Sequence, residues 1–132
     1  MNITADTTVI LRFLLNDDPK QAAAAKKVLS KAAIVAVALP TLCEVVWVLL
    51  HGYKMTTSDV ADALEVFLNS QTIRVNRSAA DAGLLLLRAG GDFADGVIAF
   101  EGLALGGTTF VSFDKKPIAL LKKQGQSTQL LP

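Results

Sequence analysis

The sequence predicts an α/β fold in which helices cover both faces of a parallel β-sheet. The segment "AIVAVAL" at residues 33–39 is continuously apolar rather than alternating, a pattern typical of a strand that is buried on both faces. Strand-like and helix-like segments alternate along the chain, and this order favours parallel strands joined by helices. The 132 residues match the size of one domain, and no linker, repeat or low-complexity segment interrupts them. We therefore expect a single domain over residues 1–132.

The first half of the chain contains two predicted strands and three predicted helices. Residues 2–6 form a short strand, and "TTVILRFLL" after it forms a helix. The segment "DDPKQAAAAKKVLSKA" opens with Asp17, Asp18 and Pro19, which is an N-terminal helix signature. After the strand at 33–39, Pro40 starts a helix that runs through "LCEVVWVLLH" and is closed by Gly52.

The second half continues the alternation. "TTSDVADALEVFLNS" is a helix with a Ser/Thr start, "TIRV" a strand, and "SAADAGLLLLRA" a helix that Gly90 and Gly91 end. "DFADGVIAFEGLAL" predicts a further helix, "TTFVSF" a buried strand, and "STQLL" a last edge strand.

Composition narrows the class of protein. Hydrophobic residues make up 52% of the chain and charged residues 19%, yet no apolar run is long enough to cross a bilayer. The N-terminus carries no export signal, and the one cysteine, Cys43, excludes an internal disulfide, so we expect a cytoplasmic protein without a membrane segment. The net charge of +1 argues against a protein that coats nucleic acid through bulk charge. It does not argue against an enzyme that binds a short segment of nucleic acid. The apolar surplus fits a sheet covered on both faces and a partner surface.

Five acidic residues fall at the predicted ends of strands or the starts of helices. They are Asp6, Glu44, Asp92, Asp95 and Asp114. In a parallel sheet, the crevice outside the carboxyl ends of the strands is the usual binding place, so these carboxylates would meet at one edge. Taken singly, each acid is better explained as a helix cap or a favourable first-turn charge than as part of a site.

Taken together, the acids favour a site. Asp92 and Asp95 share one helix face, where like charges repel. Glu44 lies in a stretch too apolar to leave a charge uncompensated, and Asp114 follows a strand that should be fully buried. A hard cation would supply what these groups lack. Oxygen-only ligands select Mg²⁺ or Mn²⁺ over zinc.

Four blocks, in this order, resemble the acidic blocks of PIN-domain ribonucleases: "ADTTVILRFLLNDDPKQAAAA", "LCEVVWVL", "DFADGVIA" and "TFVSFDKK". Within that family, they are similar to the VapC-type toxins of bacterial toxin–antitoxin pairs. The resemblance spans almost the whole chain. It implies a PIN-like three-layer α/β/α sandwich with a central, mainly parallel sheet.

The resemblance also implies the residues of the site. The family's four acids fall on Asp6, Glu44, Asp95 and Asp114, which would be catalytic and hold Mg²⁺ or Mn²⁺. Asp92 matches an acid that many members have but not all, and is a secondary metal ligand.

Three further positions match or depart from the family pattern. Ser112 matches the hydroxyl that helps to orient the metal ligands in the family. Thr8 stands where the family often has Asn, which changes a hydrogen bond beside Asp6. Gly96 stands where the family commonly has Ala, and it loosens a helix turn by about 1 kcal/mol. Neither departure removes a carboxylate.

Residues around the acids have competing interpretations. Lys115 and Lys116 directly follow Asp114, and they suit RNA phosphate contacts or an ordinary solvated face. Arg12 faces either the cleft or a partner. Trp47 lies on an apolar stripe that predicts core packing rather than base stacking, and His51 is expected at a helix C-terminus rather than as a ligand or base.

These expectations combine into a Mg²⁺-dependent endoribonuclease that hydrolyses RNA phosphodiester bonds. The resemblance implies a toxin with a cognate antitoxin, and the apolar surplus fits such a partner and a homodimer. One alternative is a catalytically silent PIN-like module that binds RNA or protein; degenerate relatives usually lose an acid, and here all four positions are filled. Another is a receiver-like phosphoacceptor domain, but "TIRVN" offers no acceptor aspartate.

Overall fold

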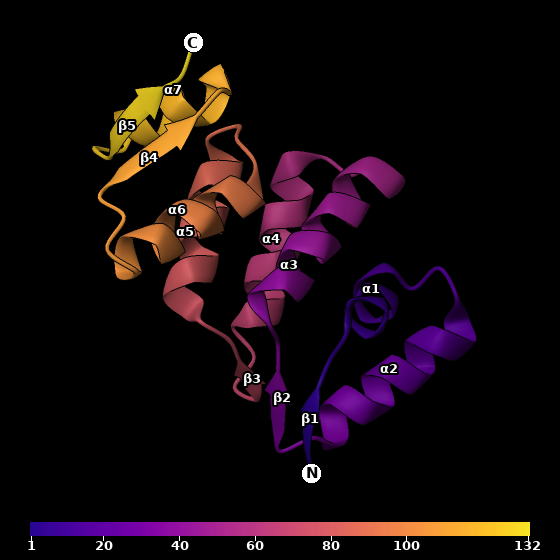
Figure 1. Cartoon of the computed structure of the whole chain (residues 1–132). Coiled ribbons are helices and arrows are strands. Elements are labelled where there is room, and N and C mark those ends of the chain that lie inside the picture. Colours follow the sequence, from indigo (N-terminus) through magenta and orange to yellow (C-terminus); the bar gives the residue numbers. More distant parts are fainter. The chain divides into compact units, whose positions relative to one another are not determined.

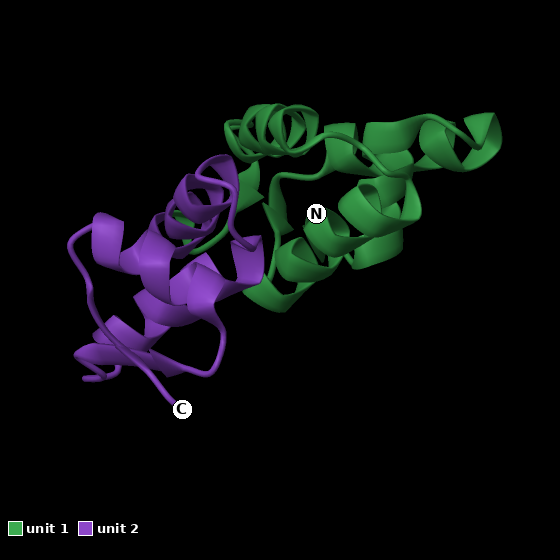
Figure 2. Ribbon diagram, turned by 90° about the horizontal axis from the view of Figure 1, so that it is seen from above, with its two compact units in different colours: residues 1–77 green, residues 78–132 purple.

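Five β-strands and seven α-helices follow one another along residues 1–132 of the computed structural model (Figure 1). The chain divides into two compact units, Met1–Arg77 and Ser78–Pro132, which Figure 2 colours green and purple. Helices and parallel strands occur in both units, so the predicted α/β class is confirmed. The strands form two sheets, a three-stranded one in the first unit and a two-stranded one in the second. The single domain over residues 1–132 stays a prediction.

The first unit is built on three parallel strands: β1 (Asn2–Thr4), β2 (Ile34–Ala36) and β3 (Ile73–Arg74), in that spatial order. The central strand β2 comes from the continuously apolar segment, as predicted, and Val35 in its middle is 1% exposed. Val35 aligns with Ile3 of one neighbouring strand and Ile73 of the other, so apolar side chains stand beside one another across the sheet. Four α-helices complete the unit: α1 (Thr7–Leu15), α2 (Pro19–Lys31), α3 (Leu39–Trp47) and α4 (Thr57–Leu68).

Three of these helices begin at side chains that cap them. The Asp6 carboxylate accepts a hydrogen bond from the amide of Val9 at 3.1 Å and caps α1. Asp18 caps α2, whose first residue is Pro19, as the sequence signature predicted. The hydroxyl of Thr56 caps α4. In each case a side-chain oxygen satisfies a backbone amide for which the helix itself has no partner.

Helix α3 continues into a π-helical turn, η1 (Val48–Gly52), in which the amide of Tyr53 donates to the Val48 carbonyl at 3.1 Å. Trp47 at the junction is 60% exposed, so the prediction of core packing for this side chain is wrong. The helical period explains the error, because the buried positions form one stripe and Trp47 lies outside it. That stripe consists of Leu42, Val45, Val46 and Leu49.

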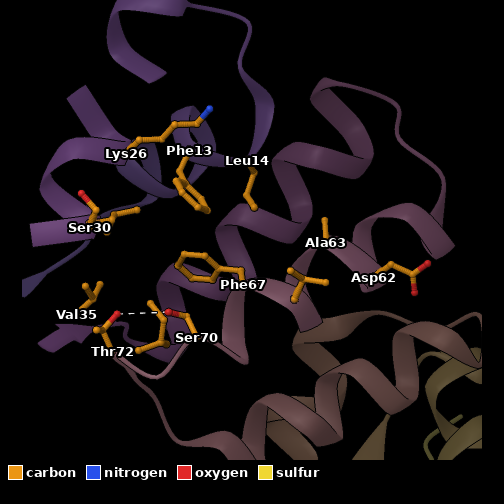
Figure 3. Close-up of a pocket in the computed structure, with 13 residues that line it drawn as sticks. Phe13, Leu14, Lys26, Ser30, Val35, Asp62, Ala63, Phe67, Ser70 and Thr72 are labelled. Atoms are coloured by element: carbon orange, nitrogen blue, oxygen red, sulfur yellow. Dashed lines mark hydrogen bonds between the residues drawn. The ribbon is translucent and has the colours of Figure 1, made fainter. Parts of the chain in front are cut away.

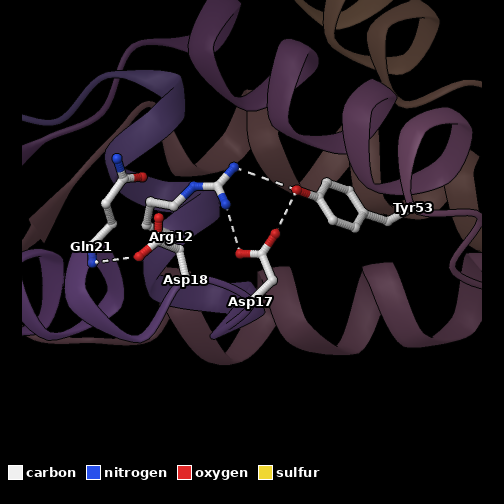
Figure 4. A network of polar contacts seen from close by, with 5 residues as sticks. All are labelled: Arg12, Asp17, Asp18, Gln21 and Tyr53. Carbon is white, nitrogen blue, oxygen red and sulfur yellow. Dashed lines mark hydrogen bonds and ion pairs between the residues drawn. The ribbon is translucent and has the colours of Figure 1, made fainter.

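A polar network joins α1 to the segment after η1 (Figure 4). Arg12 forms an ion pair with Asp17 at 2.6 Å, and the Tyr53 hydroxyl donates to the other oxygen of Asp17 at 2.8 Å. A longer bond of 3.4 Å runs from Arg12 to the Tyr53 oxygen. The hydrogen bond from Tyr53, followed by the one from Arg12, holds the pKa of Asp17 below its ordinary value. The guanidinium of Arg12 is therefore already bonded to two residues of its own chain.

The second unit pairs β4 and β5 in parallel, and the predicted last strand is confirmed. Its core brings together Leu86, Ala99 and Leu121, with Phe110 packed against them. The expectation that the strand "TTFVSF" is fully buried is wrong, because its residues alternate between exposed and half-buried. One face of β4 contacts the core, and the other faces solvent. The elements are α5 (Arg77–Arg88), α6 (Phe93–Ala104), β4 (Thr109–Ser112), α7 (Lys115–Lys123) and β5 (Ser127–Leu130).

Helices α5 and α6 approach one another so closely that two glycines are required. A Cβ atom at Gly96 would lie 2.5 Å from the carbonyl oxygen of Ala82, and one at Gly83 would lie 2.6 Å from the ring of Phe93. Phe93 is fully buried against this contact. Gly96 thus has a packing role that its low helix propensity does not reveal, and it fixes the first turn of α6 on α5.

Replacing Gly96 with Ala should destabilise the chain although Ala is the better helix former. The added methyl meets backbone atoms of α5 that cannot swing aside, and overpacking of this kind costs about 1–3 kcal/mol. Gly102→Ala is the matched control, because it lies on the same helix and its Cβ would meet open space. That variant should be neutral, or gain about 0.5–1 kcal/mol from helix propensity. Urea denaturation of both variants checks this, and equal free energies of unfolding would contradict the close contact.

Candidate functional site

Three carboxylates of the second unit lie around the first turn of α6 and the start of α7. Asp92 occupies the N-cap position of α6 and accepts a long hydrogen bond of 3.4 Å from the amide of Ala94. Asp95 follows in the first turn and is half-buried. Asp114 occupies the N-cap position of α7, but its carboxylate makes no capping hydrogen bond. The cap interpretation therefore fits Asp92 and fails for the carboxylate of Asp114.

Asp95 lies in surroundings that disfavour its negative charge. Burial raises its pKa above the ordinary value, and the negative charges of Asp92 and then Asp114 raise it further. Asp92 and Asp114 are thus each close enough to Asp95 to repel its charge, and the spacing of Asp92 and Asp95 predicted the first of these repulsions. A group that resists ionisation in the free protein becomes a good ligand once a cation compensates its charge.

A hydroxyl binds the backbone at the start of α7. The Ser112 Oγ atom accepts a hydrogen bond from the backbone amide of Asp114 at 2.9 Å. This bond fixes the backbone that carries Asp114, while the carboxylate itself stays available to another ligand. That Ser112 helps to orient the metal ligands stays a prediction.

Asp6 in the first unit has a different environment. Its Oδ1 atom accepts the amide of Val9 at 3.1 Å and the hydroxyl of Thr8 at 2.9 Å. These bonds hold the pKa of Asp6 below its ordinary value, with the Val9 amide contributing most. Both of these bonds end on Oδ1. Thr8, which departs from the family pattern, donates the second of these bonds.

Glu44 lies on the exposed side of α3. The expectation that an apolar surrounding leaves its charge uncompensated is therefore wrong, because the neighbours Val45 and Val46 point into the core and Glu44 does not. Its apolar sequence context follows from the helical period, and says nothing about a metal.

The donor set fits a hard divalent cation in its chemistry, since it consists of carboxylates and neighbouring hydroxyls. Within each unit, however, no group of three or more His, Cys, Asp or Glu side chains is arranged to hold a metal ion. Asp6 and Glu44 belong to the first unit, and Asp95 and Asp114 to the second. That all four act as one site stays a prediction.

The cationic candidates differ in their surroundings. Lys115 and Lys116 are exposed at the start of α7, directly after Asp114, where phosphate contacts are sterically open. Arg12, by contrast, is bonded to Asp17 and Tyr53. The contact between Arg12 and Tyr53 could not be predicted from a sequence pattern, because the two residues are 41 positions apart in the chain.

The first unit contains an apolar pocket of about 600 Å³ (Figure 3). The rings of Phe13 and Phe67 face one another in it, with centroids 5.8 Å apart. Lys26 and Asp62 supply charges at its rim. The sequence contains no signal for this pocket, because its lining comes from one face each of α1, α2 and α4 together with β2 and β3.

Replacing Asp95 with Asn should stabilise the folded chain at neutral pH. Because the folded-state pKa of Asp95 is raised, its protonated form favours folding; that stability is complete below the ordinary pKa of 3.8 and is lost as the pH rises through the folded-state value. Asn stays neutral throughout, so the variant should exceed the wild type in free energy of unfolding at pH 7, and the gap should close below pH 3.8.

Urea denaturation at both pH values measures this gap, and Glu101→Gln, at an exposed acid on the same helix, provides the control. A wild type as stable as Asp95→Asn at pH 7 would contradict the repulsion among the three acids.

Comparison with known proteins places these observations in a family. No curated protein matches the chain. No helix has the length and apolar character that crossing a membrane requires. The PIN domain matches residues 3–123, which run from β1 to the end of α7. PIN domains are commonly nucleases and typically bind divalent metals. The α/β fold is the PIN-like one that the acidic blocks implied, and the extent of the match shows that the chain belongs to the PIN-domain family.

Proposed function

We propose that this chain is an endoribonuclease that depends on Mg²⁺, with Mn²⁺ as a substitute, and that it is the toxin of a toxin–antitoxin pair. The observation that carries the proposal is Asp95, half-buried and repelled by Asp92 and Asp114 in a chain of the PIN-domain family. Such a cluster costs stability in the free protein, and a bound divalent cation removes the cost. Catalysis explains why the sequence keeps it.

The proposed ligands are Asp6, Glu44, Asp95 and Asp114, with Asp92 in a secondary role. Two hydroxyls support them, because Thr8 donates to Asp6 and Ser112 holds the backbone of Asp114. The bond from Thr8 ends on the carboxylate of Asp6, and the bond to Ser112 fixes the backbone of Asp114 without engaging its carboxylate. The acids need not act as proton donors for this purpose, and their role is to hold charge in place.

The metal supplies the hydrolytic chemistry when bound, by polarising the phosphodiester and lowering the pKa of a water molecule. The chain's own cations bind the substrate: Lys115 and Lys116 stand beside Asp114 and suit RNA phosphates. A histidine base is not required. His51, the one histidine, has its Nδ1 atom 3.1 Å from the carbonyl oxygen of Trp47, at the helix end where it was expected.

An antitoxin is the proposed protein partner. The apolar pocket in the first unit supports it, because an exposed hollow lined by Phe13, Leu14 and Phe67 suits apolar side chains of another polypeptide. Lys26 and Asp62 at its rim would fix the orientation of such a segment through charge. A homodimer in the cytoplasm completes the proposal. The apolar side chains exposed in the second unit, among them Leu105 and Phe113, suit that interface.

The purified chain should cleave single-stranded RNA with Mg²⁺ or Mn²⁺, and should stop when EDTA removes the metal. Asp95→Asn should lower the cleavage rate by a factor of about 10² or more, because loss of one charge-stabilising group in an active site costs about that much. Glu101→Gln is the control and should cleave at the wild-type rate. Gel analysis of a labelled RNA measures all three. Full activity in Asp95→Asn would remove this residue from the mechanism.

Metal binding can be tested without catalysis. Mg²⁺ or Mn²⁺ should raise the melting temperature of the wild type, because a ligand that binds only the folded state stabilises it. In Asp95→Asn the increase should be much smaller. KCl at matched ionic strength separates binding from screening of the repulsion. Equal increases in both proteins would show that the metal binds elsewhere.

A further inference from the structure

Trp47, the only tryptophan of the chain, displays its ring to solvent at the end of α3. The ring of His51 stacks on it, with centroids 4.8 Å apart and an angle of 24° between the planes. The His51 Nδ1 atom lies 3.1 Å from the Trp47 carbonyl oxygen. Because a carbonyl only accepts hydrogen bonds, Nδ1 carries the proton and Nε2 points elsewhere.

The π-helical turn fixes this pair of rings. Val48–Gly52 carries His51, and the Tyr53 amide closes the turn on the Val48 carbonyl. Tyr53 is in turn bonded to Asp17. Backbone and side-chain hydrogen bonds therefore hold the ring of His51 against Trp47, so the flat surface exists before any ligand arrives. Single π-helical turns of this kind are frequent at functional sites.

The ring pair shares the exposed stripe of α3 and η1 with Glu44. Positions 44, 47 and 51 are separated by three and four residues, which places them on one side of the helix. All three are exposed, whereas the stripe of apolar residues between them is buried. A polymer that passes Glu44 along this side of the helix meets the rings one turn later.

We propose that Trp47 and His51 form a stacking platform for a nucleobase of single-stranded RNA, on the side of α3 and η1 that also carries Glu44. This inference rests on the proposed function and adds a binding element to it. The bases of single-stranded RNA are unstacked, and proteins commonly hold them against aromatic side chains. Stacking accepts any base, because every base has a π-face. Lys54, exposed just after the turn, supplies a positive charge for the adjoining backbone.

The surroundings favour a base over a protein partner. A stable protein interface buries a broad apolar core, but Trp47 shares its exposed stripe with the carboxylate of Glu44 and the imidazole of His51, and its apolar helical neighbours Cys43 and Leu50 are only partly exposed. The Tyr53 hydroxyl nearby is bonded to Asp17 and Arg12. An exposed ring pair of this limited extent suits a single base.

The test uses Asp95→Asn, which should bind RNA without cutting it. Titration with a short single-stranded RNA should quench the emission of Trp47, and this signal is unambiguous because no second tryptophan exists. Anisotropy of a labelled copy of that RNA then gives affinities for further variants in the same background. Trp47→Ala should bind about tenfold or more weakly, as expected for loss of one base–aromatic stack. Trp47→Phe keeps a ring and should bind within about threefold of the parent, and His51→Ala should fall between the two.

Circular dichroism should show all variants folded, because both rings are exposed. Unchanged affinity in Trp47→Ala, or RNA saturation without a change in emission, would overturn the platform. So would a Trp47→Ala variant that loses self-association in light scattering but keeps its RNA affinity, since this face would then be a protein interface. RNA binding that depends on Trp47 in a wild type that never cleaves RNA would support the platform and reject the nuclease.

Discussion

The close contact between helices α5 and α6 is the constraint on which the candidate site depends. Gly96 lies against the backbone of α5, and Phe93 fills the space beside Gly83. These contacts leave the first turn of α6 no freedom to tilt away, and Asp95 belongs to that turn. Its carboxylate is therefore held half-buried beside two other negative charges. A looser helix pair would let Asp95 move into water, and its pKa would return toward the ordinary value.

The carboxylates that the sequence analysis assigned to one site differ in how readily they ionise. Asp6 accepts two hydrogen bonds and ionises more readily than usual, whereas Asp95 is desolvated and repelled and ionises less readily. Asp114 stands at a helix start, yet Ser112 engages its backbone amide. Opposite shifts among acids of the same type are frequent where enzymes assign separate tasks to them. Local hydrogen bonds thus stabilise the negative charge of Asp6, whereas burial and two neighbouring negative charges disfavour that of Asp95.

Much of the fold could be predicted because it depends on local signals. The Asp18–Pro19 start of α2, the closing glycines of α5 and the apolar run of β2 are each readable from a few adjacent residues. Contacts between distant segments were not predictable, as the Arg12–Tyr53 bond and the apolar pocket show. For the site, the repulsion between Asp92 and Asp95 followed from spacing on one helix. The part played by Asp114 depends on how α6 and β4 pack, which no local pattern encodes.

Helix α3 shows how an apolar context can mislead. The segment "LCEVVWVLL" surrounds Glu44 with apolar residues in the sequence. A helix of 3.6 residues per turn nevertheless directs neighbouring side chains to different sides. Leu42, Val45 and Val46 are buried while Glu44 and Trp47 are exposed. The charge of Glu44 then needs no cation, so its sequence context lends the metal site no support, and the physical case for the site falls on Asp95. The same geometry explains why Trp47, which was predicted to lie in the core, is exposed to solvent on the same side of the helix as Glu44. A helix whose buried stripe is complete without these two side chains is free to use them for binding.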